Sequence, residues 1–60
     1  MRGKELVKLL EKHGWVLDRI SGSHHIMVKE GRRPVPIPVH GKKDLNKRML
    51  HGILKEAGIK

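Results

Sequence analysis

The chain has 60 residues, with 14 Lys and Arg against 6 Asp and Glu, which gives a formal net charge of +8 and a sequence pI near 10.5. A chain this short should form a single domain over residues 1–60 with a small core, so any chemistry is expected on its surface and not in a deep pocket. The absence of cysteine excludes disulfides, thiolate metal sites and thiol nucleophiles. The sequence has no long apolar run and no signal-like N-terminus, which predicts a soluble, cytoplasmic protein without a membrane partner.

The first predicted element is an amphipathic helix over residues 4–13. Its leucines fall on one stripe and its charged residues on the other side. Gly14 suits the left-handed position that follows a helix, and Trp15 is placed where a hydrophobic residue folds back on Leu10. We therefore expect the helix to end at this glycine.

Three strand-length segments follow, over residues 15–20, 24–29 and 33–39. The links between them have only three residues, and links this short favour antiparallel neighbours. The middle segment begins directly after the turn Ser21-Gly22-Ser23. The pattern predicts a three-stranded meander.

The third segment has proline at every second position, alternating with Val35, Ile37 and Val39. Alternate N–H groups of a strand point to opposite edges, so these prolines remove all the donors from one edge only. A polyproline-like linker is the alternative, but β-branched residues with a period of 2 favour a strand with one buried face. The segment is predicted to be an edge strand whose proline side faces solvent.

A second amphipathic helix is predicted near the C-terminus, where Gly58 would stop it and Ile59 would meet Leu54. Asp44 or Asn46 could cap its N-terminus. The fold class is then α+β, with the order α-β-β-β-α and both helices on one face of a three-stranded antiparallel sheet.

Charge is distributed unevenly along the chain. Residues 1–30 carry 6 basic and 4 acidic residues, whereas residues 31–60 carry 8 and 2. This excess predicts a phosphate-binding surface in the second half, although an acidic protein partner would also explain it. The candidate RNA-binding residues are Arg32, Arg33, Lys42, Lys43, Lys47 and Arg48.

The turn Gly22-Ser23 delivers His24 to the head of a strand. An ordinary imidazole is largely unprotonated at neutral pH, and RNA supplies its own nucleophile, the 2′-hydroxyl, so a base beside cationic residues would suffice for cleavage. Ser23 would orient His24 or a phosphate, or would be a plain turn residue. His25 is the second candidate proton carrier, on the opposite face of the strand. The histidines lack metal-ligand spacing, so no metal or other cofactor is expected.

The chain also resembles a known family. The resemblance is carried by Leu9-Leu10-Glu11-Lys12-His13-Gly14-Trp15, Arg19, Gly22-Ser23-His24-His25, Lys42-Lys43-Asp44-Leu45 and Ile53-Leu54-Lys55-Glu56-Ala57-Gly58-Ile59. These residues are similar to the HicA (YcfA-like) toxins, and the similarity spans about residues 4–59.

The resemblance implies a metal-independent mRNA interferase with a fold like the double-stranded RNA-binding domain, inhibited by a HicB-type antitoxin. It implies His24 as the catalytic histidine, with Gly22 and Ser23 forming the supporting turn. The chain departs from the family pattern at Gly3, Asn46 and Met49, which bears on helix capping. The alternatives are a non-catalytic double-stranded RNA-binding module, or a DNA-binding or partner-binding module with no RNA role.

Overall fold

The computed structural model describes residues 1–59 and has five elements in the order α-β-β-β-α. The sheet has the strand order β1-β2-β3, and both neighbouring pairs are antiparallel. The predicted α+β fold is therefore confirmed. The elements are α1 (Gly3–Lys12), β1 (Val16–Ser21), β2 (His24–Val28), β3 (Val35–Pro38) and α2 (Lys47–Glu56).

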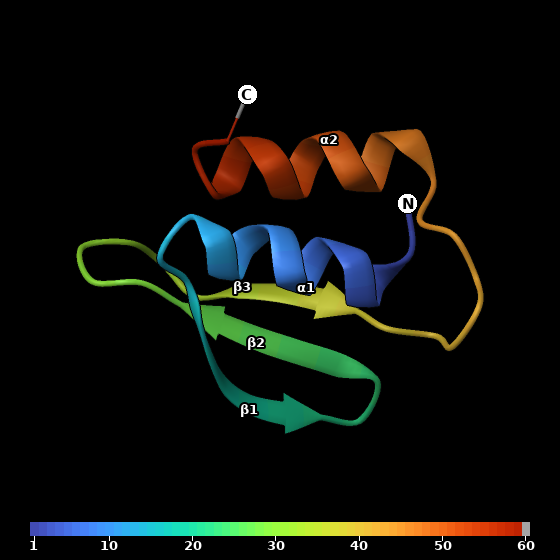
Figure 1. Cartoon of the computed structure of the whole chain (residues 1–60), viewed down its shortest axis with the longest axis horizontal. Helices are drawn as coiled ribbons and strands as arrows, with labels where there is room; N and C mark the ends of the chain where they lie inside the picture. The colour runs from blue at the N-terminus through green and yellow to red at the C-terminus, as the bar shows by residue number, and fades with distance from the viewer. Residues whose placement is uncertain (60) are drawn as a thin grey trace.

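The two helices lie on the same side of the sheet and run in the same direction (Figure 1). Their N-termini lie at the end of the molecule that also holds the β1–β2 turn and the connection after β3, which we call the hairpin end. Their C-termini lie at the opposite end, beside the β2–β3 connection. The hairpin end therefore receives the positive ends of both helix dipoles.

The core lies between the helices and the sheet. Met27 and Ile37 are fully buried on the helix side of the sheet, where they meet Leu6 and Leu10 of α1. Among residues 1–59 no polar or charged residue is buried. The remaining core residues are Val7, Trp15, Val35, Ile53 and Ala57.

Both helices stop as the sequence predicts. Gly14 has a φ of 89°, and the Trp15 N–H donates to the Leu10 carbonyl at 3.0 Å. Gly58 has a φ of 72°, and the Ile59 N–H donates to the Leu54 carbonyl at 2.9 Å. In each case the third residue after the helix donates back across the last turn, and the bond satisfies a carbonyl that the helix leaves free.

Of the two predicted caps, Asn46 is the one observed at α2. Its Oδ1 accepts a hydrogen bond from the Met49 N–H at 2.8 Å. The cap holds the start of α2 at the hairpin end.

The proline strand β3 lies at one edge of the sheet, as predicted. The Val39 N–H donates to the Ser23 carbonyl at 2.7 Å. The N–H groups of Val35, Ile37 and Val39, which alternate with the prolines, therefore face β2. The prolines occupy the other set, and the free edge of β3 therefore presents carbonyls without N–H donors. The regular strand is shorter than the predicted segment 33–39.

The two faces of the sheet differ in what covers them. Met27 is in the core, so His25, two residues earlier on β2, lies on the same, helix-covered face. His24 lies on the other face, which no element of residues 1–59 covers and which we call the bare face. The choice of face therefore separates the two adjacent histidines.

Candidate active site

The turn that presents the histidines consists of Gly22 and Ser23. Ser21 and His24 are paired on either side of it, and Gly22 has a φ of 60°. A two-residue hairpin turn with glycine in the left-handed region at its first position is the II′ type, whose twist matches that of the strands. The turn thus fixes the register of β1 and β2, and with it the face that each histidine occupies.

His24 is exposed on the bare face, where its cross-strand neighbours are Ser21 and Pro38. The next residue of β1 on the bare face is Arg19. Its guanidinium is already paired with the Asp18 carboxylate at 2.6 Å. His24 does not line the groove beside β2 in which Lys and Arg side chains gather. Its catalytic role stays a prediction.

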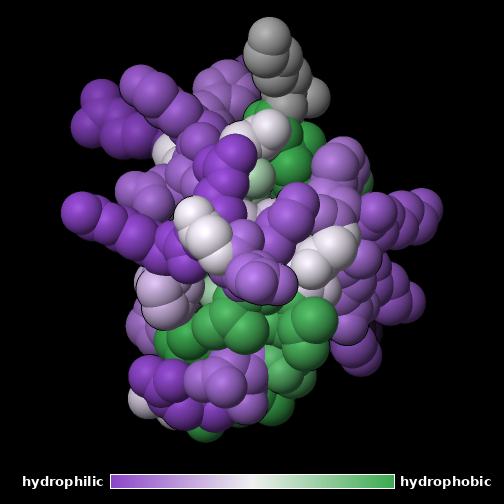
Figure 2. Space-filling view, turned by 90° about the vertical axis from the view of Figure 1, so that its left-hand side faces the viewer, coloured by the Kyte–Doolittle hydropathy of each residue, from purple (hydrophilic) through white to green (hydrophobic). Residues whose placement is uncertain are grey.

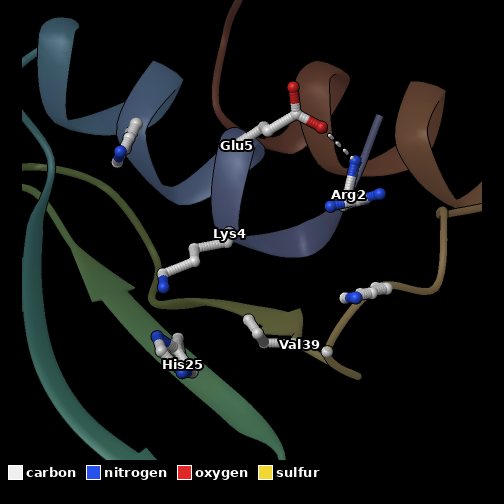
Figure 3. Close-up of a pocket in the computed structure, with 8 residues that line it drawn as sticks. Arg2, Lys4, Glu5, His25 and Val39 are labelled. Carbon is white, nitrogen blue, oxygen red and sulfur yellow. Dashed lines mark hydrogen bonds between the residues drawn. The ribbon is translucent and has the colours of Figure 1, made fainter.

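His25 instead lines an open groove between the N-terminal half of α1, the middle strand and the connection after β3 (Figure 3). The groove has a volume of about 880 Å³. It is lined by Arg2, Lys4, Glu5, Lys8, His25, Val39, Gly41 and Lys42. We call this cavity the basic groove.

Four of the groove side chains are cationic and one is a carboxylate. That carboxylate, Glu5, accepts a hydrogen bond at 2.9 Å from the Arg2 backbone N–H and so caps the start of α1. Lys4 extends from α1 toward His25 (Figure 3). With the helix N-terminus alongside, the groove is a cationic trough suited to a phosphate group.

The His25 side chain is half-buried, and its Nδ1 atom is buried without a hydrogen-bond partner. That leaves Nε2 as the ring nitrogen that a molecule in the groove could reach.

The six predicted RNA-binding residues do not form one surface. Only Lys42 lines the basic groove, and Lys43 follows it in the same connection. Lys47 and Arg48 lie in the first turn of α2, also at the hairpin end.

The other two predicted residues, Arg32 and Arg33, lie on the β2–β3 connection at the opposite end (Figure 1). A Cβ built on Gly58 would lie 2.6 Å from an Arg32 guanidinium nitrogen, so Arg32 packs over the end of α2. Arg33 lines a second, smaller groove between β3 and α2. The six candidates are therefore divided between the two ends of the molecule, and their role in RNA binding stays a prediction.

Sequence reasoning missed the contribution of the first helix. Lys4 and Lys8 are four residues apart on α1, so they lie on one face of the helix, and both line the groove with Arg2. The i, i+4 spacing was the available signal. The comparison of net charge between the two halves of the chain did not reveal this contribution, because the groove combines cations from both halves.

Two further properties of the described residues bear on function. In residues 1–59 no three His, Asp or Glu side chains lie together in a way that could hold a metal ion. Neither helix within this range has the length and apolar character required to cross a membrane.

Comparison with known proteins shows similarity to a protein family and to solved structures. The family described as the HicA toxin of bacterial toxin-antitoxin systems matches residues 3–59. A solved structure, described as a toxin-antitoxin complex from Streptococcus pneumoniae, contains a chain that is 50% identical with a TM-score of 0.86. The match covers 98% of each chain. No protein with a curated description matches significantly.

Proposed function

Because the chain belongs to the HicA family, the toxins of bacterial toxin-antitoxin systems, we propose that it is an endoribonuclease that cleaves mRNA in the cytoplasm without a metal ion. We further propose that a HicB-type antitoxin inhibits it. The observation that best supports the nuclease activity is the basic groove, in which one imidazole lies among four cationic side chains.

The proposed reaction uses the RNA's own 2′-hydroxyl as the nucleophile. The Nε2 atom of His25 takes the proton from this hydroxyl, and O2′ attacks the adjacent phosphorus. The P–O5′ bond breaks, and O5′ takes up a proton as it leaves. The products are a 2′,3′-cyclic phosphate and a free 5′-hydroxyl. The groove cations stabilise the negative charge that grows on the phosphoryl oxygens.

The groove geometry favours His25 over His24 as the proton carrier. A base must reach the same phosphodiester that the cations hold, and His25 shares the groove with Lys4 and Lys42. His24 projects from the other face of the strand, away from these cations. Under this proposal Gly22 and Ser23 support the site by fixing the register that turns His25 into the groove.

The proposal is tested by incubating the pure protein with single-stranded mRNA and an excess of EDTA, beside the variants His25→Ala and His24→Ala. We expect the wild-type protein to cleave, and His25→Ala to lose about 10²- to 10⁴-fold in rate, the usual effect of removing a general base. His24→Ala is the matched control, one residue away on the same strand, and should keep its rate within about threefold.

Each other outcome contradicts a stated part of the proposal. Loss of activity in His24→Ala alone would return the catalytic role to the histidine that the family resemblance implies. Loss of activity in EDTA would show that a metal ion is required. RNA that is retained equally by all three proteins but never cut would identify a non-catalytic RNA-binding module.

A further inference from the structure

The two edges of the sheet differ in a way that the proposed nuclease activity does not explain. The free edge of β3 presents no N–H donors, because its prolines occupy that edge. Strand β1 forms the other edge and contains no proline. It therefore offers both donors and acceptors to an added strand.

Strand β1 is also the most exposed element of the fold. All six of its residues are exposed, and three of them are apolar: Val16, Leu17 and Ile20 are 62%, 36% and 57% exposed. The space-filling view shows hydrophobic surface gathered in its lower part, the level at which β1 lies in Figure 1 (Figure 2). Exposed apolar residues on an open strand edge are the properties of a surface that binds an extended chain.

The position of Ile20 connects this edge with the basic groove. Ile20 is paired with His25 across the β1–β2 ladder, so the two side chains lie side by side on the helix-covered face. Leu17 is paired with Met27 on that face as well. A chain added to β1 would therefore pack on Ile20 and lie one strand away from His25.

We propose that the free edge of β1 is where the antitoxin docks, by adding an acidic, extended segment as a fourth strand. The proposal rests on the assignment of the chain as a toxin with an antitoxin partner, but not on its chemistry toward RNA. Seated on β1, the segment contacts Ile20 and closes the side of the groove next to His25. This binding mode requires no displacement of the His25 ring.

Charge favours an acidic partner over a second copy of this chain. The protein carries a net charge of +8, so two copies repel each other, whereas an acidic partner is attracted.

The test measures the affinity of the purified cognate antitoxin by calorimetry for the wild-type chain and for Ile20→Lys. A Lys in place of this apolar contact should weaken binding at least about 30-fold, as expected for loss of an interface anchor. Met49→Lys is the matched control, because Met49 is an apolar residue of similar exposure, 42%, on α2. It should bind with unchanged affinity.

Amide hydrogen exchange on the wild-type complex provides a second measurement that does not depend on any variant folding. Antitoxin should slow the exchange of the outward-facing amides of β1, which have no partner in the free chain. A side chain contact alone would not produce this protection.

Equal binding by Ile20→Lys, or no added protection in β1, would overturn the proposal. A greater loss in Met49→Lys would move the docking surface to α2. Protection of β1 in the isolated chain, together with a dimer mass in light scattering, would make a second copy the occupant. None of these readouts involves RNA, so failure of the nuclease proposal would be recognised separately.

Discussion

The two ends of this small fold both carry basic residues, but these residues have different surroundings. At the opposite end from the hairpin, the Lys29 ammonium donates to the His13 carbonyl at 2.7 Å, and Arg32 packs over Gly58. Both helix C-termini lie there, so these cations lie where the negative dipole ends and free carbonyls attract them.

At the hairpin end the relation is reversed. Lys4 and Lys42 lie near helix N-termini, whose N–H groups and dipoles are also positive. Among the described residues, the Glu5 carboxylate is the one anionic side chain that lines the basic groove. Cations at a helix C-terminus are satisfied within the protein, whereas those at a helix N-terminus are left to attract an external anion. The position of a basic residue relative to the helix ends therefore indicates its role better than the total charge does.

The largest effect on this contrast should come from Gly3→Ala, which disturbs the hairpin end directly. A Cβ at Gly3 would overlap the Pro38 carbonyl oxygen and lie 3.0 Å from the Val39 Cα, so the start of α1 must move away from the sheet. We expect a loss of about 1–3 kcal/mol in the free energy of unfolding, as for overpacking in a core. Urea denaturation measures it.

Gly52→Ala is the matched control for that prediction. A Cβ at Gly52 would meet nothing within 4 Å, and alanine is the better helix former, so this variant should be more stable by up to about 1 kcal/mol. A Gly3→Ala protein as stable as wild type would show that the start of α1 is not held against β3.

A smaller effect is expected from Lys4→Met, which keeps the length of the side chain and removes its charge from the groove. If the groove holds phosphate, the rate of RNA cleavage should fall roughly tenfold, the equivalent of about 1.4 kcal/mol for one charged contact. Lys12→Met is its control on the same helix, because Lys12 lies in the last turn at the opposite end. Equal losses in the two variants would mean that net charge and not position governs activity.

The parts of the fold that local rules determine could be predicted from the sequence. Gly14 and Gly58 stop the helices because left-handed backbone is open to glycine, and the alternating prolines fix β3 at an edge. The alternation of a strand also predicts that His24 and His25 lie on opposite faces.

The face that each histidine takes could not be predicted in this way. His24 is in phase with Ile26 and Val28, and His25 is in phase with Met27, so both faces of β2 carry apolar residues. The packing of α1 on Met27 makes the choice, and that is a tertiary contact. The same packing brings Lys4 and Lys8 to the groove from a helix whose charged side is solvated in any amphipathic pattern.

The smallest effect should come from Lys29→Met, at the end opposite the groove. This substitution removes the donor to the His13 carbonyl, while the His13 ring, whose Nδ1 donates to the Leu9 carbonyl at 3.0 Å, continues to cap α1. Because the site is exposed, we expect the free energy of unfolding to fall by only about 0.5–1 kcal/mol. Thermal unfolding measures this change, and RNA cleavage by the folded variant should match that of the wild-type protein. A loss of cleavage as large as that of Lys4→Met would contradict the division between the two ends, because Lys29 would then act on RNA despite being satisfied by the helix C-terminus.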